Sequence, residues 1–330
     1  MTNQNILVVG GAGYIGSHTA KAIQNAGFKP IVIDDLSSGH SHNVKYGPFI
    51  QANMNNREAI ASAIKHYSPR AIMHFAACIE VGEGEKDPIK FYKNNVANAI
   101  ALFECAIEND IKNIVFSSTA ATFGVPKAKY IAESHPQNPI NTYGRSKLMV
   151  EQVLLDFGKA YGVNSAILRY FNACGADEAG ELGEEHSPET HLIPNVLASI
   201  AGRRESLSIF GDDYDTPDGT CVRDYIHVSD LADAHVAAAR YLFENNSSIA
   251  LNLGTKSGTS VKEIMSAAER VTGLPCKWEL CARREGDPAY LIADSSLARQ
   301  KIGFNPIRSD IDTIIKTAWN FHMKKWGISP

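Results

Sequence analysis

A glycine-rich turn near the amino terminus restricts the fold of this chain more than any other sequence feature. The apolar run Asn5–Val9 has the character of a strand, Gly11, Gly13 and Gly16 follow with the spacing G-x-G-x-x-G, and a helical pattern comes next. These glycines permit a tight turn, close approach of the backbone to a pyrophosphate, and close packing of helix on strand. The helix amino terminus attracts the phosphate charge. The turn predicts a dinucleotide-binding unit, with an ordinary glycine-rich turn as the alternative.

A pair of carboxylates follows the second strand-like run, Pro30–Ile33. Asp34 and Asp35 stand at roughly the offset from the last glycine that dinucleotide-binding units require. A carboxylate there accepts hydrogen bonds from both hydroxyls of the adenosine ribose and repels a 2′-phosphate. The sequence therefore predicts NAD as the cofactor rather than NADP, and a solvated strand end is the alternative for Asp34.

A tyrosine and a lysine four residues apart, Tyr143 and Lys147, would share one face of a helix. Upstream, the strand-like run Ile114–Phe116 ends in Ser117, Ser118 and Thr119. Tyrosine normally titrates near pH ~10, so it becomes a base near neutrality only where positive charge stabilises the phenolate. Lys147 and the positive nicotinamide of NAD would supply that charge together, although Tyr and Lys at this spacing also occur on solvated helices.

Strand-like and helical segments alternate along the first half of the chain. Further strands are expected at 49–50, 71–76, 113–117 and 165–170, and helices at 57–66, 95–108 and 143–157. Such alternation is typical of an α/β fold with a Rossmann-type, doubly wound parallel sheet. We expect an NAD-binding Rossmann domain over 1–176 and a smaller C-terminal α/β substrate-binding region over 177–330, with the helix at 228–244 able to return to the first domain.

Composition and charge limit the kinds of partner that the protein is expected to bind. The chain has 330 residues, 44% of them hydrophobic, and a net charge of −4, which gives no electrostatic reason to expect nucleic acid or an anionic membrane surface as a partner. No segment approaches the ~20 apolar residues of a membrane-spanning helix, and the polar start Met1–Gln4 leads straight into the first strand. A cytoplasmic location is expected.

Metal-binding spacing is not evident in the sequence. The eleven histidines include no H-E-x-x-H or comparable motif. His74 lies in a strand-like run, where a core residue with its hydrogen bonds satisfied is expected rather than a ligand. We predict no metal.

Several separated motifs resemble one known family. They are the segments Gly10–His18, Ser117–Ala120, Tyr143–Lys147, Leu168–Asn172, Asp218–Val228 and Arg283–Asp287. Together they resemble the UDP-glucose 4-epimerases, which are extended short-chain dehydrogenases/reductases, and the likeness covers nearly the whole chain. The resemblance implies an isomerase that reversibly epimerises UDP-glucose and UDP-galactose at C4 through a 4-keto sugar, with NAD retained through the cycle.

The resemblance also implies roles for individual residues. Tyr143 as a phenolate would take the proton from the 4-hydroxyl while hydride leaves C4 for the nicotinamide; the 4-keto sugar then turns, and hydride returns to its other face. Lys147 would lower the pKa of the phenol and hold the nicotinamide ribose, and Thr119 would hydrogen-bond the 4-oxygen and help to relay the proton. The positions that match the cofactor-binding residues of the family are Gly10, Gly13, Tyr14, Ile15, Gly16, Asp34, Asp35, Leu36, Ser37, Ser38, Gly39, Asn53, Met54, Phe75, Ala76, Ala77, Ile79, Asn95, Thr119, Tyr143, Lys147 and Phe171. The positions that match its substrate-binding residues are Thr119, Tyr143, Asn172, His191, Leu192, Ile193, Ser208, Ile209, Phe210, Arg223, Arg284, Asp287 and Leu291.

Some positions depart from the commonest family pattern. Asn53 stands where an Asp often contacts the adenine, and Ile79 replaces a frequent Lys, so both bear on NAD affinity. Ala120 and Ala121 occupy places where related dehydratases and decarboxylases carry an acid, which favours epimerisation. Leu291 is intermediate in size at a position that affects tolerance of acetamido sugars, and the plain UDP-hexose pair is favoured.

Two other interpretations stay in view. One is a 4-epimerase of another UDP sugar, namely an N-acetylhexosamine, a uronic acid or a pentose, and the other is a non-catalytic NAD-binding sensor. The family resemblance further implies a homodimer in which the helices 95–108 and 143–157 pair as a four-helix bundle. Apolar residues such as Phe103, Val150 and Leu154 on these helices fit that role, although packing on the sheet would produce the same pattern.

Overall fold

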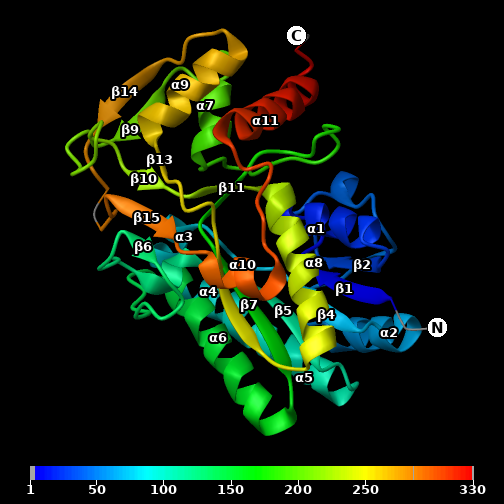
Figure 1. Ribbon diagram of the computed structural model, residues 1–330. Coiled ribbons are helices and arrows are strands. Elements are labelled where there is room, and N and C mark those ends of the chain that lie inside the picture. The colour runs from blue at the N-terminus through cyan, green and yellow to red at the C-terminus, as the bar shows by residue number, and fades with distance from the viewer. Residues whose placement is uncertain (1–3, 285, 329–330) are drawn as a thin grey trace.

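A large parallel sheet, covered by helices on both faces, forms the body of the protein (Figure 1). The computed structural model describes residues 4–284 and 286–328. Glu285 of the motif Arg283–Asp287 and residues Met1–Asn3 of the polar start lie outside this part. A smaller assembly, which contains α7, α9 and α11, occupies the upper part of the view in Figure 1.

The main sheet has seven strands in the order β12-β7-β5-β4-β1-β2-β3, and every neighbouring pair is parallel. The strands are β1 (Asn5–Val9), β2 (Lys29–Asp34), β3 (Phe49–Gln51), β4 (Ala71–His74), β5 (Asn113–Thr119), β7 (Asn164–Tyr170) and β12 (Ile249–Leu253). The expected doubly wound fold is confirmed. The strand order reverses between β1 and β4, so the loops that follow these two strands leave a crevice at the carboxyl edge of the sheet, where ligands bind in such folds.

Both faces of the sheet are buried, which explains its nearly continuous apolar strands. In β1, Leu7 and Val9 point into one core while Ile6 and Val8 point into the other, as the two-residue period of a strand requires. The first core is closed by α2 (Arg57–Tyr67), α5 (Asn98–Glu108) and α6 (Thr142–Tyr161). The second is closed by α1 (Tyr14–Asn25), α8 (Val228–Asn245) and α10 (Ser296–Ile302).

The smaller assembly has its own core between three helices and short strands. The helices are α7 (Leu192–Ile200), α9 (Val261–Thr272) and α11 (Ile311–Trp326). Its short strands are β6 (Tyr130–Ile131), β8 (Asn172–Cys174), β9 (Leu207–Phe210), β10 (Val222–Arg223), β11 (Tyr225–His227), β13 (Thr259–Ser260), β14 (Trp278–Cys281) and β15 (Tyr290–Ala293). They form a four-stranded sheet, β13-β10-β15-β6, and the pairs β8–β11 and β9–β14.

Two of the differences from the sequence-based expectations concern β12 and α5. The strand β12 was not expected, yet it completes the main sheet beside β7. The expected helix over 95–108 begins at Asn98, because the preceding residues Tyr92–Ala97 form a π-helix, η2. The remaining short helices are η1 (Ser41–Asn43), α3 (Val81–Lys86), α4 (Pro88–Phe91) and η3 (Ala120–Phe123). Helix α8 packs against α1, and the domain boundary at 176/177 stays a prediction.

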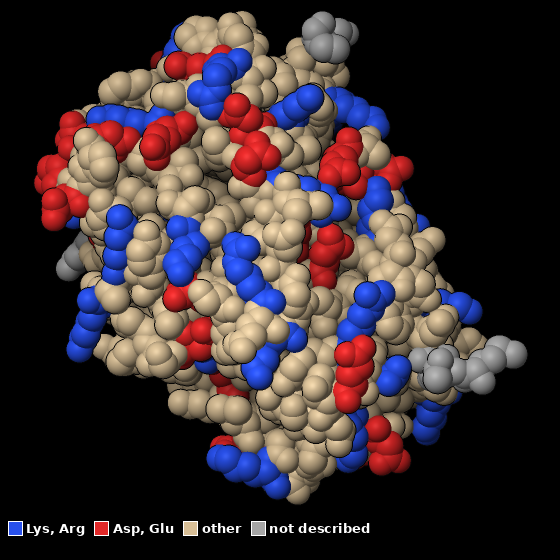
Figure 2. Space-filling view, viewed as in Figure 1, with Lys and Arg blue, Asp and Glu red and all other residues tan. Residues whose placement is uncertain are grey.

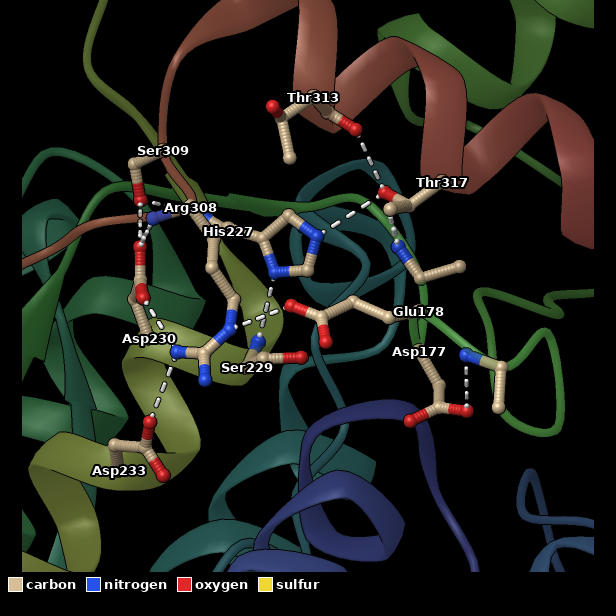
Figure 3. A network of polar contacts seen from close by, with 12 residues as sticks. Asp177, Glu178, His227, Ser229, Asp230, Asp233, Arg308, Ser309, Thr313 and Thr317 are labelled. Carbon is tan, nitrogen blue, oxygen red and sulfur yellow. Dashed lines mark hydrogen bonds and ion pairs between the residues drawn. The ribbon is translucent and has the colours of Figure 1, made fainter.

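A polar network ties α11 to the helices of the main sheet (Figure 3). Arg308, just before α11, forms ion pairs with Glu178 at 2.7 Å and with Asp230 of α8 at 3.0 Å. His227, at the end of β11, meets the hydroxyl of Thr317 on α11 at 3.0 Å. The Asp230 side chain is buried, so its charge depends on these partners.

The surface carries mixed charge. On the face shown in Figure 2, Lys and Arg side chains are interspersed with Asp and Glu and do not merge into one basic area. Among the described residues, no helix has both the length and the apolar character that crossing a bilayer requires.

Replacing Arg308 tests the network. We expect Arg308→Met to lower the free energy of unfolding by about 1–3 kcal/mol, because the buried carboxylate of Asp230 loses a charged donor. Urea unfolding monitored by circular dichroism gives the measurement. Arg270→Met is the control, since Arg270 and its partner Asp312 are both exposed and such pairs contribute less than about 1 kcal/mol. Equal losses in the two variants would contradict the assigned role of the network.

Candidate active site

Contacts within the protein require glycine at two positions of the turn between β1 and α1. Gly10 has φ +83°, and a Cβ there would lie 2.5 Å from the backbone nitrogen of Ala76. A Cβ on Gly16 would lie 2.1 Å from the carbonyl oxygen of Gly10. Both positions therefore require glycine whatever binds nearby.

Gly13 is different, because a Cβ there would meet no described protein atom closer than 3.5 Å. Gly13 is also the N-cap of α1, and neither a side-chain cap nor an acidic residue in the first turn satisfies the amides at that end. Free amides and the positive end of the helix dipole suit an anion. The turn thus fits the pyrophosphate of a dinucleotide.

The two carboxylates after β2 are held by the backbone. Asp34 accepts hydrogen bonds from the amides of Ala12 at 2.9 Å and Leu36 at 2.8 Å, which orient it beside the glycine turn. Burial raises the pKa of Asp34, and these two bonds oppose the rise. Asp35 accepts from the amide of Ser37 at 2.9 Å and from the side chain of Asn53. Asn53 thus points its amino group at a carboxylate, where an aspartate would bring a second negative charge.

Asn95 braces the loop that follows β4. Its side chain accepts from the amide of Cys78 at 2.8 Å, donates to the Cys78 carbonyl at 2.9 Å and donates to the hydroxyl of Ser146 at 3.0 Å. The loop is fixed at its start as well, since the amide of Phe75 donates to the carbonyl of Val9 at 2.8 Å. Asn95 lies in the π-helix η2, a form often found at functional sites. Its role in this structure is to join the loop to α6.

Thr119, Tyr143 and Lys147 come together where β5 ends and α6 begins. Asn141 caps α6 by accepting from the amide of Gly144 at 2.7 Å, which fixes the first turn that carries Tyr143. Lys147, one turn later, is only 3% exposed and donates to the carbonyl of Ser117 at 2.9 Å. Its ammonium lies 6.0 Å from the centre of the Tyr143 ring. The arrangement supplies a phenol, a hydroxyl and a cation at one point.

Ionisation of the Tyr143 phenol requires positive charge beyond that of Lys147. Burial raises the pKa of Tyr143 to about 12, and only the hydroxyl of Thr119 opposes the rise. Burial lowers the pKa of Lys147 to about 7, although the charge of Glu151 raises it. Lys147 by itself therefore does not make Tyr143 a base near neutrality, and the positive nicotinamide expected from the sequence is the missing contribution.

Glu151 and Arg169 form a buried ion pair beneath the site that the sequence analysis missed. Glu151 is 1% exposed and Arg169 6%, and the guanidinium donates to both carboxylate oxygens, at 2.6 Å from Nη2 and 3.0 Å from Nε. The hydroxyl of Ser118 and the amide of Gln137 donate to the same carboxylate. Glu151 continues the helix face of Tyr143 and Lys147 at the same four-residue spacing, and this was the available signal.

Two further groups near Thr119, Tyr143 and Lys147 were not assigned a role. The hydroxyl of Tyr170 meets that of Ser117, and burial followed by the charge of Tyr143 raises the pKa of Tyr170. His74 lies in the core as expected, but its Nδ1 has no hydrogen-bond partner in the described residues, so it is not satisfied. Its ring packs on Phe116, and burial with the charge of Lys147 lowers the pKa of His74 to about 3. His74 is therefore neutral.

The residues matched to the nucleotide part of a substrate divide into two groups. Arg223 on β10 forms an ion pair with Asp287, and Leu291 on β15 is its register partner. The guanidinium of Arg284 lies over the ring of Phe210, 3.9 Å from its centre. These residues converge at one edge of the smaller assembly.

The other group is less uniform. Ile209 and Ile193 are buried in the core of the smaller assembly, so only their backbone can face a ligand. Ser208 lies on the opposite side of β9 from Ile209, as the strand alternation demands. His191 caps α7, and its Nδ1 lies 2.9 Å from Glu184 and 3.0 Å from Glu189. Burial lowers the pKa of His191, but these carboxylates raise it to about 10.

Other matched positions lie in helices, strands, loops or the core. Phe171 lies between β7 and β8, and Asn172 opens β8 with its amide bonded to the carbonyl of Asp224 at 3.0 Å. Ile79 is exposed in the loop after β4, and Met54 is buried in the core beneath the sheet edge. Tyr14 donates its hydroxyl to the carbonyl of Gly175 at 2.6 Å, which links the first helix to the loop after β8.

Comparison with known proteins identifies similar chains. The profile of the NAD dependent epimerase/dehydratase family matches residues 6–254. A UDP-glucose 4-epimerase of Rhizobium meliloti (strain 1021) is 51% identical over 325 residues, which cover 98% of this chain and 99% of the relative. The likeness stated from the sequence motifs is thereby confirmed.

Solved structures give the same result. The crystal structure of UDP-glucose 4-epimerase from Brucella ovis in complex with NAD is 50% identical, with a TM-score of 0.94 over 96% of this chain and 98% of that one. That of UDP-glucose-4-epimerase from Stenotrophomonas maltophila with bound NAD and formylated UDP-arabinopyranose is 36% identical, with a TM-score of 0.96 over 98% of this chain and 99% of that one.

Glu151→Gln tests the buried pair. We expect the free energy of unfolding to fall by about 3–5 kcal/mol, because the variant leaves the buried charge of Arg169 without its partner. Asp156→Asn is the control on the same helix, where the exposed pair with Lys159 should matter by less than about 0.5 kcal/mol. Both are measured by urea unfolding, and a loss below about 1 kcal/mol in Glu151→Gln would refute the role assigned to the pair.

The ionisation of Tyr143 gives a second prediction. Without cofactor the phenol stays protonated until the pH approaches 12, and the positive ring of NAD lowers its pKa, so the phenolate forms at lower pH when NAD is bound. Ultraviolet difference spectra between the protein and Tyr143→Phe, with and without NAD, measure this titration. An unchanged midpoint on adding NAD would exclude the cofactor as the source of charge.

Proposed function

The chain belongs to the NAD dependent epimerase/dehydratase family, and on that premise we propose that it reversibly epimerises UDP-glucose and UDP-galactose at C4. The observation that carries the proposal is the convergence of Thr119, Tyr143 and Lys147, called here the catalytic trio, at the carboxyl end of β5, two strands from β1 and its glycine turn. NAD, when bound, would accept the hydride from C4 and return it. The chain's own residues then have to move one proton and hold one sugar.

Tyr143 is the proton acceptor in this proposal. As a phenolate it takes the proton of the 4-hydroxyl, and it returns that proton when the 4-keto sugar is reduced. Thr119 lies next to the phenol, where its hydroxyl already lowers the pKa of Tyr143, and it hydrogen-bonds the sugar 4-oxygen. Lys147, buried and bonded to the carbonyl of Ser117, is placed to hold the nicotinamide ribose.

The nucleotide half of the substrate would be held by the smaller assembly. Arg223 and Arg284 have forked donors that suit a diphosphate. The ion pair with Asp287 orients the guanidinium of Arg223, and stacking on Phe210 orients that of Arg284. Rotation of the keto sugar requires that binding energy be concentrated on the nucleotide, so that the hexose can present either face.

The proposal favours the plain hexoses over other UDP sugars because Leu291 lies beside Arg223, at the position where a smaller residue would leave room for an acetamido group. A UDP-N-acetylhexosamine, UDP-uronic acid or UDP-pentose is the second candidate. Epimerisation of such a sugar would follow the same chemistry, and only the fit of the sugar in the pocket would differ. The non-catalytic sensor is disfavoured by the presence of all three residues of the catalytic trio.

We also propose a homodimer in the cytoplasm, with pairing through α5 and α6. Phe103, Val150 and Leu154 are buried in the core under the sheet and do not offer a pairing face. On α6, Met149 is 42% exposed and Leu155 is 50% exposed, so these two side chains support the proposal instead. Analytical ultracentrifugation tests the homodimer, and cell fractionation tests the cytoplasmic location.

Incubation of the purified protein with UDP-galactose, without added NAD, tests the reaction. We expect conversion to UDP-glucose, followed by NMR of the anomeric protons, and a loss of turnover of at least about 100-fold in Tyr143→Phe with NAD still bound. UDP-N-acetylgalactosamine in parallel separates the two substrate candidates. Undiminished turnover in Tyr143→Phe would remove Tyr143 from the mechanism, and conversion of neither sugar, repeated with added NAD, would overturn the proposal.

A further inference from the structure

Four potential metal ligands gather in the long loop between β8 and α7, apart from the catalytic trio. They are Glu184, His186, Glu189 and His191, called here the Glu–His cluster. One potential ligand atom of each lies within 4.8 Å of those of the others. The residues follow the order E-x-H-x-x-E-x-H, which differs from the helical spacing sought in the sequence.

The Glu–His cluster is compact enough for its four side chains to reach one ion. Nδ1 of His191 lies 2.9 Å from Glu184 and 3.0 Å from Glu189, and Nδ1 of His186 lies 3.4 Å and 3.5 Å from the same two carboxylates. Zinc bonds of about 2.0–2.2 Å in a tetrahedron place neighbouring ligand atoms about 3.3–3.5 Å apart. The contacts of His186 have this spacing, whereas those of His191 are the shorter contacts of direct ion pairs, which an ion would have to separate. The other ligand atoms lie within 4.8 Å of one another.

An unsatisfied atom points to the same conclusion. Nδ1 of His186 is inaccessible to solvent, yet it makes no hydrogen bond of acceptable geometry within the described residues. The Glu184 side chain beside it is only 5% exposed. A buried carboxylate and a buried imidazole nitrogen that face each other need a proton or a cation between them. Two protonated imidazoles would neutralise the carboxylates, and so would one divalent ion.

Contacts with neighbouring residues hold the side chains of the Glu–His cluster in position. One oxygen of Glu189 accepts from the amides of Thr190 and His191, both at 2.9 Å, and the ring of His186 packs edge-on against Tyr14 at 6.4 Å between centroids. Such supporting contacts orient metal ligands in known sites. The loop over 175–191 has no helix or strand, and loops longer than about 12–15 residues without such structure are uncommon and are usually either functional or disordered.

We propose that the Glu–His cluster binds one divalent transition-metal ion, with zinc as the ion of best fit. Two imidazole nitrogens and two carboxylates complete a closed, neutral shell, which is typical of a structural rather than a catalytic zinc. The ion fixes the start of α7, because His191 stands immediately before that helix, and it fixes the loop against Tyr14 of α1. The proposal does not depend on the catalytic trio. It uses His191, which is also one of the positions matched to the substrate-binding residues, and it departs from the sequence-based prediction of no metal.

The test uses the full chain with any affinity tag removed. After EDTA treatment and dialysis, zinc is titrated by calorimetry, and bound zinc is counted by inductively coupled plasma mass spectrometry. We expect one zinc per chain and a rise in the melting temperature of the wild-type protein. The affinity should fall by more than about 100-fold in His186→Asn and in Glu184→Gln, since changes to groups behind the ligands already cost about 10- to 100-fold.

His42→Asn is the matched control. His42 is an exposed histidine that meets Glu185, the residue next to the cluster, so it reports non-specific binding to histidine on the same surface. One zinc per chain in this control and in the wild type supports the proposal. No binding by the wild-type protein would overturn it, as would equal affinity in wild type and His186→Asn, and the cluster would then be two ion pairs. The wild-type titration decides the matter even if a variant fails to fold.

Discussion

The contact between the β1–α1 turn and the loop after β4 is the constraint on which the rest of the structure depends. Gly10 lets the turn meet the backbone of Ala76, and Gly16 lets the first turn of α1 meet the carbonyl of Gly10, where any side chain would overlap. This contact fixes the position of α1, against which α8 packs, and α8 in turn receives the Arg308 network that anchors α11. A steric condition at two residues thereby determines how the smaller assembly faces the crevice.

Local patterns were sufficient to predict much of the fold. Several strands of the first half were recognised as apolar runs that end at glycine, aspartate or serine, and their alternation with helices predicted the doubly wound parallel sheet. The strand β12 was not predicted, because Ile249–Leu253 is short, is interrupted by Asn252, and lies far along the chain from its partner β7. Pairing between distant segments leaves no mark on local sequence.

The same limit applies to the candidate site. Tyr143, Lys147 and Asp34 belong to spacings that a sequence displays, and the structure places each at the carboxyl edge of the sheet. The partner of Glu151 could not be read from its neighbours, because Arg169 comes from β7 and the two meet only when α6 lies across the sheet. The Glu–His cluster was hidden for another reason. Its ligands come from an irregular loop, which has no period to recognise.

The path of the chain has a consequence for how such proteins can change over time. The chain enters the four-stranded sheet at β6, returns for α6 and β7, leaves again after β8, and comes back for α8, β12 and α10. Neither layer is encoded by one uninterrupted stretch of the gene. A genetic exchange that replaced a single contiguous segment from α6 to β12 would mix ancestry within the main sheet and within the smaller assembly at once, so this topology favours inheritance of the whole unit with gradual change at the pocket edge.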